Sequence, residues 1–114
     1  MPDVVTPFGR ILLTDTGSEL TISLARRGRL WPIAVWRPET GYVPEAPEGV
    51  PWSGAVHREL VAAGLIVPWS GDPTTDEAQR CWRREAIAAL SPYCGNVIAR
   101  WVRRRRASVA QTAT

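Results

Sequence analysis

Lysine is absent from this chain of 114 residues, so all 14 basic residues are arginine. Arginine presents a planar, permanently charged fork that suits carboxylates, phosphates and aromatic faces. The chain also has only 2 cysteines and 1 histidine, and none of them stands in a paired spacing such as Cys-x-x-Cys. A structural zinc site normally requires about four such ligands, so we expect no metal and no cofactor.

Long apolar runs are missing as well. No stretch of the sequence approaches the roughly 18 apolar residues that span a membrane. The first ten residues contain Asp3 and no basic segment that leads into an apolar run, so we expect no secretory signal. These absences predict a cytoplasmic protein without a membrane partner, in which Cys81 and Cys94 are reduced, packed thiols.

Sequence motifs and residue spacings that are typical of enzyme active sites are also missing. The sequence contains no GxGxxG, Walker or GxSxG motif. His57 has no serine, cysteine or aspartate at a recognisable spacing, so we expect a surface or half-buried histidine rather than a general base. Glu85 falls inside the apolar arc of its predicted helix, which favours an ion pair with Arg104 or Arg37. We therefore predict that the protein is not an enzyme.

The length of the chain indicates one small domain, because domains usually span roughly 100 to 200 residues. The hydrophobic fraction of 45% and the charged fraction of 22% are ordinary for a globular protein. We predict one compact domain over residues 1–107, followed by a flexible tail over residues 108–114. The domain is predicted to divide into a β-meander (1–37), a Pro-rich loop (38–53) and a helical part (54–107).

The first third reads as β-structure. Apolar and polar side chains alternate over residues 19–25, which is the period of a half-buried strand. A helix capped by Ser18 is the competing interpretation, but the Thr and Ile content favours the strand. Residues 9–14 and 30–36 are predicted to form the flanking strands. Pro32 cannot donate to a sheet ladder, so the last strand is predicted to lie at an edge or to begin after the proline.

The second half reads as helical. The first helix is predicted to begin at an N-cap, Ser53, and to stop at Gly64. The second follows a cap at Thr74 or Thr75 and runs to about Leu90, and the third begins with Ser91 as cap and Pro92 in its first turn. Residues 65–69 between the first two helices are a short extended piece that could join the sheet. The predicted fold class is α+β, with a small three-stranded antiparallel N-terminal sheet packed against a C-terminal three-helix segment.

Charge is distributed unevenly along this chain. Residues 1–74 carry 6 arginines and 8 acids, whereas residues 75–114 carry 8 arginines and 3 acids. Arginines on exposed helix faces give sequence-independent, salt-sensitive affinity for phosphates. The candidate nucleic-acid contacts are five arginines predicted to face away from the core and three that extend the set along the chain: Arg80, Arg83, Arg84, Arg100 and Arg103, then Arg104, Arg105 and Arg106.

Aromatic residues form the second candidate surface. The chain has 6 tryptophans against 1 phenylalanine and 2 tyrosines, and several flank the acidic, Pro-rich loop. Aromatic and arginine side chains are the composition of a protein-binding hot spot. The candidate protein-binding residues are Trp31, Trp36, Arg37, Tyr42 and Trp52. The competing interpretation is that the tryptophans close the core of the small sheet.

Two functional hypotheses of different classes follow. The first is a small non-enzymatic nucleic-acid-binding or regulatory protein that uses the arginine-rich C-terminal helical face. The second is a protein–protein interaction module, such as an adaptor, an inhibitor or a phage or mobile-element assembly subunit, that uses the Trp- and Pro-rich loop. The arginines can also be the solvated outer faces of two amphipathic helices, and near a helix C-terminus they suit the helix dipole.

Overall fold

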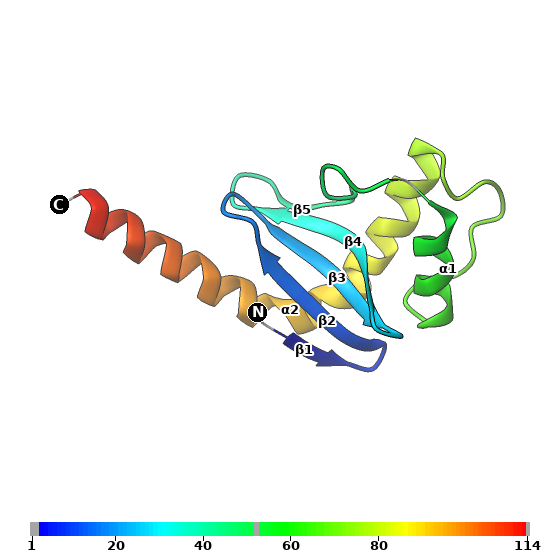
Figure 1. Cartoon of the computed structure of the whole chain (residues 1–114), viewed down its shortest axis with the longest axis horizontal. Coiled ribbons are helices and arrows are strands. Elements are labelled where there is room, and N and C mark those ends of the chain that lie inside the picture. Colours follow the sequence, from blue (N-terminus) through cyan, green and yellow to red (C-terminus); the bar gives the residue numbers. More distant parts are fainter. Residues whose placement is uncertain (1–2, 52, 114) are drawn as a thin grey trace.

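The computed structural model describes residues 3–51 and 53–113, with side chains up to Ser108 (Figure 1). Its strands form one antiparallel sheet in the order β1-β2-β3-β4-β5, so each strand pairs with its neighbours in sequence. Two helices follow the sheet. The elements are β1 (Asp3–Thr6), β2 (Gly9–Asp15), β3 (Leu20–Arg26), β4 (Arg29–Arg37), β5 (Gly41–Val43), α1 (Gly54–Ala62) and α2 (Asp76–Ala113).

The predicted three-stranded sheet is wrong, because the sheet gains one short strand at each edge. At the first edge, the hydroxyl of Thr6 donates to the Gly9 carbonyl at 2.8 Å and accepts from the Phe8 amide at 3.1 Å, which closes a tight turn between β1 and β2. At the other edge, Gly41 takes a φ of 76° that few other residues adopt, and it returns the chain into β5. Residues 65–69 do not join the sheet.

Strand β4 is an interior strand despite Pro32, so its predicted place at an edge is also wrong. The pairing of β3 with β4 passes from Ile22 opposite Ala34 to Ser23 opposite Pro32, which leaves Ile33 as an extra residue on β4. Such a β-bulge accommodates a proline, because the ladder is already interrupted there. It also leaves backbone carbonyls of β4 free for a partner outside the sheet.

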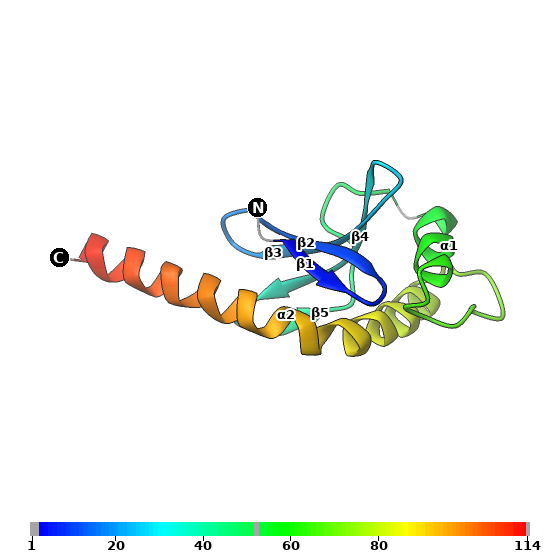
Figure 2. The ribbon, with the colours of Figure 1, turned by 90° about the horizontal axis from the view of Figure 1, so that it is seen from below.

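The second and third predicted helices are one helix, α2, with Pro92 inside it. The local signal was misleading, because serine followed by proline is typical of a helix start. A proline in a helix interior removes one hydrogen bond and bends the axis. Figures 1 and 2 show α2 changing direction near its middle. Burial on both sides of the proline, at Leu90 and Cys94, holds the two halves against the same sheet and keeps the helix continuous.

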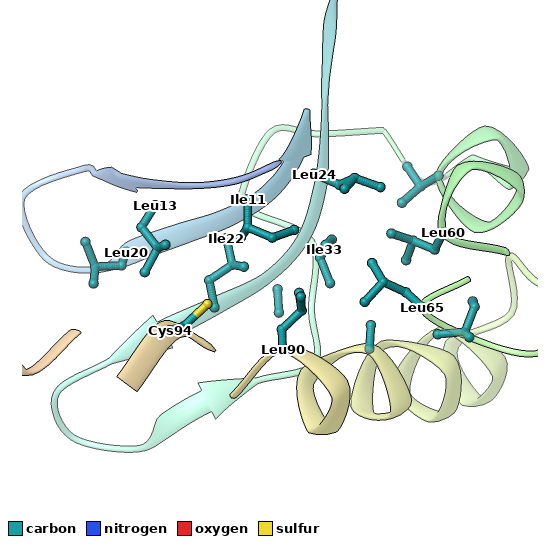
Figure 3. Packing of buried hydrophobic residues seen from close by; sticks show 14 of the residues in the cluster. Ile11, Leu13, Leu20, Ile22, Leu24, Ile33, Leu60, Leu65, Leu90 and Cys94 are labelled. Carbon is teal, nitrogen blue, oxygen red and sulfur yellow. The ribbon is translucent and has the colours of Figure 1, made fainter. Parts of the chain in front are cut away.

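The core lies between one face of the sheet and α2, and α1 closes one end. Alternate residues of the strands point into it, as the period of the pattern predicts. Figure 3 shows Ile22 and Ile33 directed towards Leu90 and Cys94 of α2, while Leu60 enters from α1. All five side chains are at most 2% exposed.

Helix α1 begins and ends as predicted. The Ser53 hydroxyl accepts from the Ala55 amide at 3.0 Å, which satisfies one of the free N–H groups of the first turn. At the other end Gly64 has a φ of 82°, and the amide of Leu65 donates back to the Leu60 carbonyl at 3.0 Å. This is a Schellman ending. For α2 the hydroxyl of Thr75 accepts from Ala78 at 3.2 Å, so Thr75 is the cap.

The turn between β3 and β4 places Arg27 at a φ of 52° and Gly28 at 75°. Two consecutive left-handed residues define a type I′ turn, whose first position favours Asn over a long side chain. We expect Arg27→Asn to raise the free energy of unfolding by roughly 0.5–1 kcal/mol, because it relieves this backbone cost. Urea unfolding of both proteins measures the change, and a less stable variant would contradict the assignment.

Candidate nucleic-acid interface

The second half of α2 carries a dense cationic surface. Residues 86–114 contain 5 arginines and no acid. Four of these arginines are exposed, and the last turns of α2 extend beyond the sheet (Figures 1 and 2). We call residues 100–106 the arginine segment, and its exposed members are Arg100, Arg103, Arg104 and Arg106.

Arg105 is the member of this segment that holds it on the sheet. Its guanidinium lies 4.7 Å from the ring centre of Trp101, within cation–π range, and it also donates to the carbonyl of Gly17 in the β2–β3 turn. Trp101 is 4% exposed and belongs to the core. The base of the arginine segment is therefore fixed, while its four exposed arginines point to solvent.

One carboxylate lies close to the base of this segment. The pKa of Asp15 is lowered, first because its carboxylate accepts from the Gly17 amide at 2.8 Å. The nearby indole N–H of Trp101 lowers the pKa of Asp15 further, although the indole nitrogen makes no hydrogen bond of normal geometry. The charges of Arg105 and Arg104 contribute least. Asp15 is a single carboxylate beside a segment with 5 arginines, so it offsets only a small part of the positive charge.

Arg80 and Arg84 are exposed as predicted, but they lie before Pro92 on α2, whereas the arginine segment lies after it. At about 100° per residue, Arg100 lies about 160° around the axis from Arg84, whereas Arg106 lies about 40° from it. The first turns of α2 also contain three carboxylates, Asp76, Glu77 and Glu85. The positive potential of α2 is consequently concentrated in its second half.

The prediction that Arg83 faces away from the core is wrong, because its side chain is directed at β4. It is 1% exposed, and its Nη1 donates to the carbonyls of Pro32, at 3.0 Å, and of Ile33. Its Nε donates to Gln79 at 2.8 Å. These are the carbonyls that the β-bulge leaves free, so Arg83 completes the hydrogen bonding of β4. Burial lowers the pKa of Arg83 to about 10. Such a residue is not available to phosphates.

The aromatic candidates pack mostly against the core. Trp36 meets Trp101 edge to face, with ring centres 5.8 Å apart, and Trp31 is half-buried. Tyr42 is half-buried too, and burial, followed by the nearby Cys94 thiol, raises its pKa to about 12. Arg37 donates to Glu19 at 3.2 Å. The remaining candidate, Trp52, lies outside the described residues.

Two expectations for single residues of α2 are wrong. Glu85 is exposed, and instead of an ion pair with Arg104 or Arg37 it accepts a hydrogen bond from the Val67 amide at 3.1 Å. Cys81 is exposed, whereas Cys94 is buried as expected, and burial raises its pKa to about 11. Both errors have one cause. The buried stripe of α2 is centred on Trp82 and Ala86, and it is too narrow to include Cys81 and Glu85.

His57 is more buried than expected, at 7% exposed. Its Nε2 accepts from the Trp69 amide at 3.1 Å, and its ring meets Trp82 edge to face with ring centres 5.5 Å apart. The sequence holds no signal for this, because the bond joins α1 to a loop without regular structure. Together, His57 and Glu85 fix residues 67–69 between the two helices.

This bond makes stability depend on pH. Burial, and secondarily the charge of Arg58, lowers the pKa of His57 below its ordinary value of 6.5. The unfolded chain therefore binds a proton at a higher pH than the folded chain, so the contribution of His57 to stability is constant above about 6.5 and falls below it. We expect a loss of about 1 kcal/mol, because a protonated Nε2 leaves the Trp69 amide unsatisfied.

Unfolding in urea between about pH 8 and pH 5 measures this loss. The assignment is direct, because the chain has 1 histidine. The variant His57→Gln serves as the control and should show a flat profile over the same range. A wild-type profile as flat as that of the variant would contradict the role of His57.

The described part of the chain was also searched for metal sites and for membrane-spanning helices. Residues 3–51 and 53–113 contain no group of three His, Cys, Asp or Glu side chains that could hold a metal ion. None of the described helices is long and apolar enough to cross a membrane. Comparisons with models of protein families, with curated proteins and with solved structures find no match for this chain.

Proposed function

We propose that the protein binds nucleic acid through the arginine segment, without sequence preference and without catalysis. One observation carries the proposal: four arginines are exposed on a helix that extends beyond the sheet, within 29 residues that contain no acid. Because no carboxylate of their own helix half neutralises these guanidinium groups, they are available to an external polyanion. Phosphate contacts of this kind release condensed counterions and supply the affinity.

The form of the segment favours duplex DNA. An α-helix fits the major groove of B-form DNA, which is about 12 Å wide. The major groove of A-form RNA is too narrow and deep for side chains to read. The exposed arginines at positions 100, 103, 104 and 106 occupy several sides of the helix, so they can reach the phosphates on both walls of a groove. We therefore expect DNA duplexes to bind more tightly than RNA duplexes.

Fluorescence anisotropy with labelled 20-base-pair duplexes tests this function. Two DNA duplexes of unrelated sequence and one RNA duplex are titrated with the protein at about 50 mM salt. We expect equal affinities for the two DNA sequences, in the micromolar range that is roughly typical of non-specific binding, and weaker binding to RNA. Absence of binding up to about 100 μM protein would contradict the proposal.

A further inference from the structure

A second cationic surface lies at the opposite end of the sheet, beside the β3–β4 turn. A groove of about 370 Å³ opens there. The aliphatic residues of its lining are Leu12, Ala25 and Leu30. These residues alternate with core residues such as Ile11 and Leu24, so they lie on the face of the sheet that is turned away from α2. Leu30 is 47% exposed, so part of this apolar side chain is open to a partner.

The lining also contains four arginines. Two of them are neutralised within the chain, since Arg10 pairs with Asp3, and the Nε of Arg26 lies 2.9 Å from a carboxylate oxygen of Glu59. Arg27 and Arg29 are exposed and form no ion pair within residues 3–51 and 53–113. The lining of the groove therefore includes two arginines that form no ion pair within the described residues, one on each side of Gly28.

The turn itself carries a backbone cost. Arg27 occupies the left-handed region at a φ of 52°, although Asn or Gly would fit the same turn without strain. Strained residues are concentrated at functional sites, because a function repays their cost. Arg27 lies in the turn itself, and Arg29 is the first residue of β4. An arginine in this position is thus better explained by what it binds than by what it does for the fold.

We propose that this groove binds an acidic peptide segment of a partner protein, in which an aliphatic side chain lies between carboxylates. The aliphatic side chain would cover Leu30 and Leu12, while the carboxylates pair with Arg27 and Arg29. Charge complementarity at the rim and apolar contact at the centre are the usual anatomy of a protein interface. The lining contains no aromatic ring on which a base could stack, which distinguishes it from single-stranded nucleic-acid sites. The proposal is independent of the arginine segment.

Labelled decapeptides test this groove in the full-length protein. The first alternates glutamate with leucine, the second alternates glutamate with serine, and the third alternates glutamine with leucine. The test variant is Arg27→Asn with Arg29→Gln, in which asparagine preserves the turn while both charges are removed. The control variant is Arg80→Gln with Arg84→Gln, which changes the net charge equally on α2, on the other side of the sheet from the groove. Circular dichroism confirms that both variants are folded.

We expect the glutamate–leucine peptide to bind the wild type and the control variant equally, and to lose at least about tenfold in affinity on the test variant. The other two peptides should bind more weakly than the first to the wild type. The proposal is overturned if the glutamate–leucine peptide does not bind, if both variants weaken its binding equally, or if the serine peptide binds as tightly. It is also overturned if single-stranded DNA displaces the peptide and loses affinity only on the test variant, because the groove would then be a phosphate site.

Discussion

Replacing Arg83 by alanine is expected to lower the free energy of unfolding by about 3–5 kcal/mol, a large part of the stability of a small domain. The guanidinium is 1% exposed and satisfies the carbonyls of Pro32 and Ile33 as well as the side chain of Gln79. Alanine would leave these acceptors buried without a donor and would open a cavity under Trp82. Each of the two defects is costly.

Two further variants separate the causes of this loss. Arg83→Met fills most of the volume and removes the cost of burying a charge, so we expect it to be less destabilising than alanine. Arg84→Ala removes the neighbouring exposed arginine and should change stability by less than about 0.5 kcal/mol. Urea unfolding measures all three variants. Equal losses at positions 83 and 84 would show that Arg83 does not hold the β-bulge.

The second large effect concerns DNA. We expect the triple variant Arg103→Gln, Arg104→Gln, Arg106→Gln to weaken duplex binding at least about 100-fold at about 50 mM salt, because three phosphate contacts are lost together. All three side chains are exposed, so stability should change little. Anisotropy titration of the same labelled DNA duplexes measures the change in affinity.

A matched control removes the same number of charges elsewhere. The variant Arg58→Gln, Arg80→Gln, Arg84→Gln also replaces three exposed arginines, and it lowers the net charge by the same amount. We expect a far smaller loss of affinity from this control, because these arginines lie away from the arginine segment. If the two triple variants bind DNA equally weakly, then net charge rather than a defined surface drives binding.

Local signals predicted local structure well. The cap at Ser53, the stop at Gly64 and the cap at Thr74 or Thr75 depend on neighbours within a few residues; the first two were confirmed, and the third is Thr75. The same kind of signal failed at Pro92, where serine and proline resemble a helix start. There, burial of Leu90 and Cys94 against one sheet outweighs the local preference. The short edge strands β1 and β5 were not predicted, because strands with so few residues show no clear alternation of apolar and polar side chains.

The position of Arg83 could not be predicted from periodicity. A helical wheel treats arginine as a surface residue, and it carries no information about a bulge on a strand 50 residues earlier. The bulge supplies the carbonyls that make burial of a guanidinium tolerable. The exposed arginines of the second half of α2 could be predicted, because the sequence itself shows that no acid follows Glu85. The unpaired arginines of the β3–β4 turn could not be predicted. They lack an ion pair because other arginines pair with Asp3 and Glu59, and only the folded structure shows those pairs.

The salt dependence of duplex binding tests the central claim most directly. Affinity is measured for the wild type and for the triple variant at positions 103, 104 and 106, at several salt concentrations between about 50 and 200 mM. Four phosphate contacts predict a slope of log affinity against log salt of roughly −3 to −4 for the wild type, and one remaining contact predicts roughly −1 for the variant. A shallow wild-type slope, or the same slope in both proteins, would contradict the assignment of the arginine segment as the nucleic-acid-binding surface.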